Sequence, residues 1–355
     1  MDRPTIDVYE ERGRQWARHR KPVRRADAKA LAARVAPGTV RIDLGCGAGR
    51  YTPDLGRPVI GFDASRTMLE LCRARAPEAW LVQGDLEALP FRPRSLGGGW
   101  ANRSYLHVPS ARLPLALADL HRVLSVGAGL DIQVLVGAYE GRDLPDDDVG
   151  GRFFASWEPD RLDDILVGAG FDIDGLEVDG EVVRVRAVRA RTLADTVGPG
   201  LRLLVVGLNP SLYAADAGVG YARPGNRFWP AALAAGVVTR DRDPDHALKV
   251  HGVGMTDVVK RATVGAKELD AAEYRSGMAR VERLVEWLTP DVVCMVGLSG
   301  WRAAVDTGAR TGVQPRRCGG RPVYVMPSTS GANAHAQLPE LVQHLKNALA
   351  VGTDR

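Results

Sequence analysis

Two short polar loops hold the residues of this chain whose types and spacing best suit chemistry. The first reads Gly-Leu-Asn-Pro-Ser (207–211) and the second reads Met-Pro-Ser-Thr-Ser-Gly (326–331). Each follows an apolar run, 201–206 or 321–325, that is typical of a buried strand. Open α/β sheets build their sites at the carboxyl ends of strands, so both loops are expected at one such edge. A third dense cluster, Arg-Pro-Gly-Asn-Arg-Phe-Trp (223–229), lies between them in the chain.

Together these three segments resemble the mismatch-specific uracil/thymine-DNA glycosylases, one branch of the uracil-DNA glycosylase superfamily. The resemblance covers nearly all of residues 201–350, with the segments in the family's order. It implies an α/β/α sandwich with a central parallel sheet. It also implies hydrolysis of the N-glycosidic bond of a base that has flipped out of DNA, without a cofactor or a metal.

The resemblance assigns the chemistry to Asn209, at a position where faster uracil enzymes carry Asp. An amide orients water and bonds the base but is a poor general base, so slow chemistry is expected. Ser211 stands where uracil-restricted relatives carry a bulky Tyr that collides with a 5-methyl group. The smaller serine therefore predicts room for thymine. Tyr221 is expected to stack on the flipped base, for about 1–3 kcal/mol. The predicted base pocket comprises Leu208, Pro210, Ser211, Tyr221 and Asn226.

The other family positions concern loop support and DNA contacts. Asn226 and Arg227 are expected to brace the active-site loop. Phe228 and Trp229 are interpreted as core residues. Ser328 is expected to contact a phosphate. At the loop tip that wedges into the duplex, the family often has Arg or Leu, whereas this chain has small and polar residues. The predicted wedge and phosphate residues are Ser328, Ser330, Gly331, Ala332 and Asn333.

Phosphate binding must come from a local basic patch, because the net charge of +4 is mild. His335 is expected near a phosphate. Thr256 and Asp257, in a segment that also resembles the family, are interpreted as helix caps. The basic residues available to the patch are Arg223, Lys260, Arg261, Arg316, Arg317 and Arg321.

The first half of the chain carries a different set of motifs. The run Asp-Leu-Gly-Cys-Gly-Ala-Gly (43–49) ends a predicted strand, Asp63 ends the next, and Gly-Asp-Leu-Glu-Ala-Leu-Pro-Phe (84–91) follows the third. Glycines in such a loop let the backbone approach a ligand closely and turn into a helix. The alternative is a loop whose glycines only pack a helix against a strand.

This set resembles the class I S-adenosylmethionine-dependent methyltransferases, over roughly residues 35–140. The resemblance implies that the glycine loop lines the methionine part of S-adenosylmethionine, that Asp63 bonds the ribose hydroxyls and that Asp85 contacts the adenine amine. Three consecutive glycines at 97–99 depart from the family, because they weaken a strand. The methyl acceptor is left open, although Asn102, Arg103, Tyr105 and His107 could face it. The predicted cofactor-binding residues are Asp43, Gly45, Gly47, Gly49, Asp63 and Asp85.

Alternation of strands with helical stretches predicts an α/β fold in both halves. A breaker cluster at 197–200 separates them. We therefore expect a Rossmann-like methyltransferase sheet with helices on both faces over 1–190, a linker over 191–200 and a glycosylase domain over 201–355. Predicted strands include 39–43, 58–63, 79–83, 129–135 and 291–297, and predicted helices include 65–76, 111–124, 300–306 and 338–349.

Composition places the chain among ordinary globular proteins. Of its 355 residues 45% are hydrophobic and 25% charged, which argues against extensive disorder and suits two domains. No stretch approaches the length of a membrane span and the first residues lack an apolar signal region, which predicts a cytoplasmic protein without a membrane partner. The four cysteines stand singly without metal-ligand spacing and are interpreted as buried, reduced thiols.

Three hypotheses about function remain open. The first is a base-excision-repair enzyme, a monofunctional glycosylase that removes uracil, and thymine or other 5-substituted pyrimidines, from mispaired DNA. It is fused to an S-adenosylmethionine-binding domain, for which methyl transfer is left open. The second keeps the glycosylase but makes the N-terminal domain a non-catalytic module that binds cofactor or DNA. The third is a damage-binding protein without turnover. The expected partners are double- or single-stranded DNA and S-adenosylmethionine, and the chain is expected to be a monomer.

Overall fold

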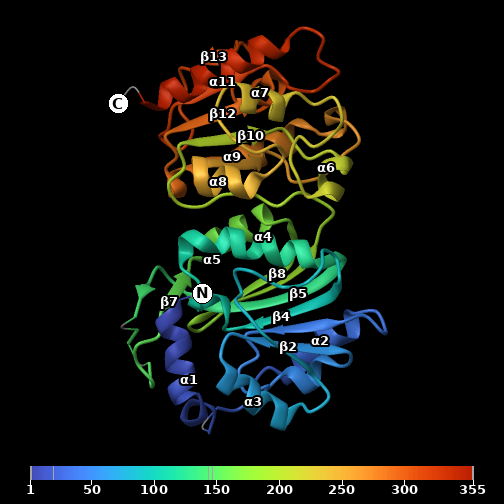
Figure 1. The fold of residues 1–355 in the computed structure, drawn as a ribbon, viewed down its shortest axis with the longest axis vertical. Coiled ribbons are helices and arrows are strands. Elements are labelled where there is room, and N and C mark those ends of the chain that lie inside the picture. The colour runs from blue at the N-terminus through green and yellow to red at the C-terminus, as the bar shows by residue number, and fades with distance from the viewer. Residues whose placement is uncertain (1, 19, 143, 146, 354–355) are drawn as a thin grey trace. The chain divides into compact units, whose positions relative to one another are not determined.

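In the computed structural model the chain forms two compact units, Met1–Ala190 and Arg191–Arg355 (Figure 1). The structure describes residues 2–18, 20–142, 144–145 and 147–353. Each unit has its own sheet. Within these described ranges, no helix combines the length and the apolar character that crossing a membrane requires.

The first unit is built on a mixed sheet of nine strands in which β3, β2, β1, β4 and β5 lie side by side and parallel. An antiparallel hairpin of β8 and β9 extends it, because β9 pairs with β5. The strands are β1 (Arg41–Leu44), β2 (Val59–Asp63), β3 (Trp80–Gln83), β4 (Leu96–Asn102), β5 (Leu124–Val136), β6 (Glu140–Gly141), β7 (Phe154–Trp157), β8 (Phe171–Asp179) and β9 (Val182–Arg189).

Helices cover both faces of this sheet, with α4 and α5 on the opposite side from α2 and α3 (Figure 1). The predicted strands and helices of this half are present, although β5 begins earlier than expected. The helices are α1 (Arg3–Arg18), α2 (Arg25–Arg34), α3 (Arg66–Arg75), α4 (Leu113–Val123) and α5 (Pro159–Gly168), with short 3₁₀ helices at Thr52–Leu55, Tyr105–His107 and Ser110–Arg112.

The three glycines at 97–99 do not interrupt the sheet, contrary to the expectation from their weak strand propensity. They lie in β4, which is paired on both sides, with β1 and β5. A Cβ on Gly98 would lie 2.6 Å from Cγ2 of Val35, and one on Gly97 would lie 2.8 Å from Cβ of Thr39. The glycines therefore let the segment after α2 pack directly on the centre of the sheet, and packing outweighs propensity here.

The second unit is a five-stranded sheet in the order β11, β10, β12, β14, β13, parallel except for β13. Helices α7 and α11 lie on one side and α9 on the other, which makes the predicted α/β/α sandwich (Figure 1), and Ala247 of α8 belongs to the core on the α7 side. The elements are β10 (Leu203–Gly207), α6 (Leu212–Ala217), α7 (Phe228–Ala234), α8 (Pro244–His251), β11 (Val253–Asp257), α9 (Ala271–Leu288), β12 (Val292–Val296), α10 (Leu298–Ala304), β13 (Gly312–Val313), β14 (Val323–Met326) and α11 (Leu338–Thr353), with a 3₁₀ helix at Ala266–Glu268.

The core of this unit is built around its four parallel strands. Strands β10, β11, β12 and β14 are buried along their whole length, as the apolar runs predict for strands covered on both faces. Phe228 and Trp229 are fully buried in the core, as expected. All four cysteines of the chain are buried and free of disulfides.

Two expectations about local structure differ from what is observed. The segment 191–200, expected to be a linker, folds as part of the second unit: Thr196 pairs with Met255 in an antiparallel bridge, and the Asp195 side chain is buried. Thr256 and Asp257 cap no helix, because they are the last two residues of β11. The polar pair that resembles a cap in sequence is instead the end of a buried strand.

The packing at Gly98 predicts that a single methyl group added at this position destabilises the fold. Gly98→Ala should destabilise the first unit by about 1–3 kcal/mol, because the new Cβ overlaps Val35. Val35→Ala in the same chain should recover part of this loss, and a double-mutant cycle measured by calorimetric unfolding checks the coupling. Purely additive effects of the two substitutions would contradict this assignment.

Candidate functional site

The polar loops of the second unit meet at the carboxyl edge of its sheet, around a cavity of about 280 Å³. Loop 207–211 follows β10, and residues 328–330 follow β14. The segments 193–196 and 263–266 complete the wall. Eight of the predicted site residues line this cavity: Leu208, Asn209, Pro210, Ser211, Tyr221, Asn226, Ser328 and Ser330.

The orientation of the Asn209 side chain is set by three acceptors. Its Nδ2 donates to Oγ1 of Thr263 at 2.8 Å, to the Arg261 carbonyl at 3.0 Å and to the Pro210 carbonyl at 3.2 Å. Carbonyl oxygens only accept, so the nitrogen must face them and the amide cannot be flipped. The amide oxygen is therefore the atom left to accept a hydrogen bond from a molecule in the cavity.

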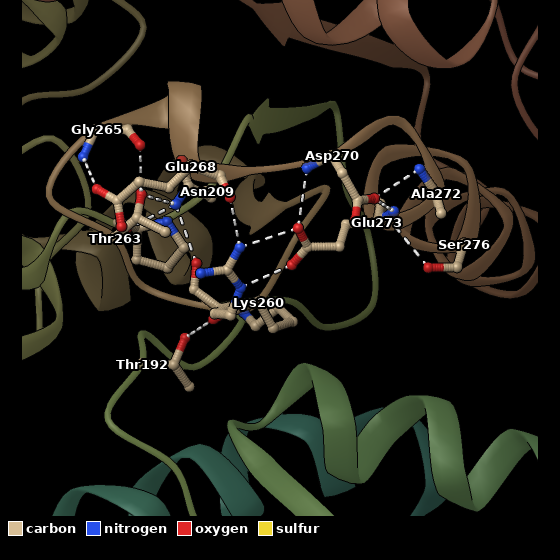
Figure 2. A network of polar contacts seen from close by, with 12 residues as sticks. Thr192, Asn209, Lys260, Thr263, Gly265, Glu268, Asp270, Ala272, Glu273 and Ser276 are labelled. Carbon is tan, nitrogen blue, oxygen red and sulfur yellow. Dashed lines mark hydrogen bonds and ion pairs between the residues drawn. The ribbon is translucent and has the colours of Figure 1, made fainter.

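A polar network anchors these acceptors to the start of α9 (Figure 2). The Arg261 guanidinium donates to both oxygens of Glu273, at 2.7 and 2.9 Å, and to the Glu268 carbonyl at 2.9 Å. Glu273 also accepts from the backbone N–H of Asp270, the N-cap of α9. The hydrogen bond from Arg261 is the main cause that lowers the pKa of Glu273 to about 2. The helix thus holds the segment that orients Asn209.

Three predicted pocket residues also support the backbone. Ser211 is the N-cap of α6, and its hydroxyl accepts from the N–H of Ala214 at 3.1 Å. Asn226 accepts from the N–H of Phe228 at 2.9 Å, where α7 begins. Tyr221 has a φ of 58°, and its ring stacks on Phe228 with centroids 4.3 Å apart. One face of the Tyr221 ring is therefore already covered.

Arg227 braces the loop after β14, as expected. It donates to the carbonyls of Ser330 at 2.9 Å, Asn333 at 2.6 Å and Ala336. The Asn333 side chain donates to the Ser328 carbonyl at 2.8 Å, and its oxygen accepts from the backbone N–H of His335 at 3.2 Å. Asn333 therefore closes the loop on itself, and Gly331 and Ala332 lie exposed at its tip, with Ser330 exposed before them and His335 exposed after them.

The predicted basic patch is only partly present at the surface. Lys260 is nearly buried and pairs with Asp195 at 2.6 Å, with Arg280 on the other oxygen of the same carboxylate at 2.9 Å. Arg261 serves the network described above. Arg223 is exposed at the cavity wall, whereas Arg316 is exposed beside Glu282. The Lys260 expectation is wrong, because a buried carboxylate takes its charge.

Asp257 is a cavity residue that the sequence interpretation did not assign to the site. Its side chain lies over Gly207: a Cβ on Gly207 would be 2.3 Å from Oδ1 of Asp257. Only 9% of Asp257 is exposed, and burial is the main cause that raises the pKa of its carboxyl to about 6. The available signal was its place at the end of an apolar run, the pattern that had identified loops 207–211 and 326–331.

The first unit has a larger cavity, of about 630 Å³, at the ends of β1 and β2. Asp43, Gly45, Gly47 and Asp63 line it, as predicted. Gly49 does not line it: at φ +69° it packs on α3, and a Cβ there would lie 2.7 Å from Sγ of Cys72.

Asp85 also lies outside the lining of this cavity. Its carboxylate accepts from the N–H of Glu87 at 2.9 Å and so supports the turn that follows β3. The neighbouring Leu86 lines the cavity instead. The adenine contact of Asp85 stays a prediction.

Asp43 and Asp63, the two predicted acidic residues that line the cavity, are held in place by donors. Asp63 accepts from the N–H of Gly47 at 2.8 Å and of Ser65 at 2.9 Å, so it ties the glycine loop to the start of α3. Asp43 accepts from the Thr52 hydroxyl at 2.6 Å. Burial is the main cause that raises the pKa of Asp43 to about 7 and that of Asp63 to about 6.

Helix α1 supplies cavity residues that the motifs did not predict. Trp16 lies over the glycine loop, 3.7 Å from where a Cβ of Gly47 would be, and the Arg50 guanidinium lies over the Trp16 ring at 4.5 Å. Nε and Nη2 of Arg50 are buried without a hydrogen-bond partner, and burial is the main cause that lowers its pKa to about 10. Arg50 is thus a cation poised for an anion.

A clasp holds α1 in place on the rest of the unit. The Tyr9 hydroxyl donates to Nε2 of His107 at 3.0 Å and accepts from Arg152 at 2.9 Å. Nδ1 of His107 donates to the Phe153 carbonyl at 2.6 Å, and burial lowers the pKa of His107 to about 4. The neutral imidazole is what this arrangement requires. Sequence could not show it, because its members are about 100 residues apart.

Comparison with solved structures finds similar proteins that cover about half of this chain. A SAM-dependent methyltransferase from Methanosarcina mazei is 17% identical over 45% of this chain and 97% of that chain, with a TM-score of 0.41. One from Mesorhizobium loti is 19% identical over 46% and 96%, with a TM-score of 0.40. One from Thermotoga maritima is 18% identical over 52% and 99%, with a TM-score of 0.42.

Comparison with protein families identifies both parts of the chain. Residues 42–130 match the family described as a methyltransferase domain, and residues 194–350 match the uracil DNA glycosylase superfamily. The chain therefore combines a methyltransferase domain with a uracil DNA glycosylase superfamily domain, two α/β folds of enzyme families. The second match begins inside the segment 191–200, in accordance with its packing.

A methyltransferase domain implies binding of S-adenosylmethionine, which supplies an electrophilic methyl group. The cavity fits this cofactor. The unpartnered Arg50 guanidinium suits its carboxylate, and the Asp63 carboxylate suits a pair of ribose hydroxyls. Gly45 and Gly47 line the cavity and have no side chain that would keep a ligand away from their backbone.

The raised pKa of Asp257 makes a prediction about stability. Its carboxyl stabilises the fold fully below pH 4, and this contribution is lost as the pH rises through about 6. The Asp257→Asn variant stays neutral at every pH. Its free energy of unfolding should therefore exceed that of the wild type by up to about 2–3 kcal/mol at pH 8 and equal it at pH 4. Calorimetry of the full chain measures the difference, with exposed Asp245→Asn as control. Equal stability at both pH values would contradict the assignment.

Proposed function

We propose that the second unit is a DNA glycosylase of the mismatch-specific branch, which removes uracil, and thymine or other 5-substituted pyrimidines, from mispaired DNA in base excision repair. The observation that carries the proposal is the fixed amide of Asn209, whose nitrogen is fully engaged and whose oxygen is left to the cavity. The Gly-Leu-Asn-Pro loop and the family match support the same reading.

In this reaction the bond between the sugar and the base breaks, and the base departs with the bonding electrons. A water molecule held by the amide oxygen of Asn209 adds to the sugar carbon and loses its proton, and the base takes up a proton from solvent. The products are an abasic site and the free base. Asn209 positions the water but is too weak a base to deprotonate it early, so turnover is expected to be slow.

The remaining loop residues prepare the substrate. A mispaired base costs least to unstack, which suits a loop tip made of Gly331 and Ala332 rather than a bulky wedge. The exposed face of Tyr221 offers a surface on which the base stacks. Arg223 and Ser328, both at the cavity wall, are placed to meet phosphates.

The test is single-turnover base release from G·U, G·T, A·U and single-stranded uracil oligonucleotides. Asn209→Ala should lose at least about 100-fold in rate, because positioned groups of this kind contribute 10²–10⁴-fold. Thr263→Val, which removes one anchor of the amide, should lower the rate without weakening DNA binding. Asn347→Ala on the exposed face of α11 is the matched control. Binding of damaged DNA without release of any base would favour a damage-binding protein.

We propose further that the first unit binds S-adenosylmethionine through Arg50, Asp63 and the glycine loop. The unpartnered guanidinium of Arg50 is the observation that carries this assignment. The methyl acceptor is not assigned, and a non-catalytic binding module remains the second candidate. Helix α1, held by its clasp over the cavity, favours an acceptor small enough to enter beneath it.

Titration calorimetry of the full chain tests the cofactor assignment. Arg50→Gln should weaken binding of S-adenosylmethionine about tenfold, because one charge-assisted hydrogen bond to a carboxylate is lost. Arg92→Gln removes an exposed arginine that does not line the cavity and should leave the affinity unchanged. Absence of heat from the wild-type chain would contradict the assignment.

A further inference from the structure

The carboxyl group of Asp257 takes no part in the proposed reaction, although it lines the cavity of the second unit. It is carried by the last residue of β11, next to the end of β10, where loop 207–211 begins. No residue that the structure describes donates a hydrogen bond to its carboxylate oxygens. A buried carboxyl group without a donor is costly, and such groups are typical of sites that receive a ligand.

The charged neighbours of Asp257 are committed elsewhere. Lys260, from the segment after β11, donates to one oxygen of Asp195. Arg280, from α9, donates to the other oxygen. Asp195, from the segment before β10, raises the pKa of Asp257, whereas the two cations lower it and burial dominates. Asp257 is therefore neutral in acid and ionised above about pH 6, with no counterion of its own.

A second unpartnered polar group lies beside it. The Tyr221 hydroxyl is buried without a hydrogen-bond partner. A Cβ on Gly207 would lie 3.1 Å from this hydroxyl and 2.3 Å from Oδ1 of Asp257, so both groups face the same space over Gly207. Both groups belong to the wall of the cavity in which Asn209 shows its amide oxygen. The polar end of this cavity thus combines a hydroxyl, which donates and accepts, with a carboxyl whose character depends on pH.

The donors and acceptors on the edge of a pyrimidine determine which base binds at this polar end of the cavity. An ionised carboxylate only accepts hydrogen bonds, so it complements the exocyclic amine of cytosine. Uracil presents a carbonyl oxygen at the same position, which an ionised carboxylate repels. A protonated carboxyl group can donate to that carbonyl. The same side chain therefore favours opposite bases on the two sides of its titration.

We propose that Asp257 selects the base, and that at neutral pH the cavity takes an amino-bearing pyrimidine, cytosine or a 5-substituted cytosine, in a mispaired or unpaired position. The inference rests on the proposed glycosylase function and specifies its substrate. The reaction is the same hydrolysis, with cytosine as the released base. Uracil remains a substrate, but it is bound more weakly than cytosine at neutral pH and more tightly only under acidic conditions.

Equilibrium binding separates selection of the base from turnover. The probes are fluorescent oligonucleotides that carry 2′-fluoro-2′-deoxycytidine or 2′-fluoro-2′-deoxyuridine, whose glycosidic bonds resist hydrolysis, opposite the same mismatched base. At pH 7.5 the full chain should bind the cytosine probe about tenfold more tightly than the uracil probe. This preference should fall severalfold at pH 5.5.

Two variants complete the design. Asp257→Asn should remove the pH dependence and shift the preference to uracil, because an amide donates to the uracil carbonyl at any pH. Asp245→Asn, an exposed carboxylate on α8, should behave like the wild type. Folding of both variants is checked by calorimetry before binding.

The outcomes distinguish the inference from the function on which it rests. Equal affinity for both probes at both pH values, together with release of uracil, overturns the inference and leaves the glycosylase proposal intact. Binding of both probes no tighter than that of the fully paired duplex overturns both. A cytosine preference that survives in Asp257→Asn also overturns the inference.

Discussion

The buried carboxylate of Asp195 is the interaction on which the second unit depends. Burial alone would raise its pKa, but Arg280 and Lys260 hold the pKa below its ordinary value. With the Thr256 hydroxyl, which donates to it at 2.7 Å, these partners join the segment before β10, the end of β11 and helix α9. Removal of one partner from such a cluster costs about 3–5 kcal/mol, because a buried charge is left alone. The cluster also leaves Asp257 without a counterion at the cavity.

Both sites use the same device to orient a reactive or binding atom. Most hydrogen-bonding positions of a side chain are occupied by backbone or neighbouring groups, which leaves one position open toward the cavity. In the second unit this holds the Asn209 oxygen outward. In the first unit Gly47 and Ser65 fix the Asp63 carboxylate. Such preorganisation lowers the cost of ordering when a ligand arrives.

The sequence predicted the strands and loops whose signals are local. Apolar runs that end in polar, proline-containing loops identified β10 and β14, and the loop with Asn209. It missed what depends on distant contacts. The glycines at 97–99 weaken a strand locally, yet packing on the segment after α2 makes them suitable for the centre of a sheet. Asp257 was interpreted as a helix cap, although the run that precedes it is also compatible with the end of a buried strand. The cover formed by α1 depends on contacts with residues about 100 positions away.

The most direct test of the central claim is a crystal structure of the full chain with a mismatched duplex that carries a 2′-fluoro pyrimidine nucleotide. The account predicts the flipped base on the open face of Tyr221 and a water molecule within hydrogen-bond distance of the Asn209 amide oxygen, on the side of the sugar. A base that lies outside the cavity, or an Asn209 amide that has turned its nitrogen to the sugar, would contradict the account.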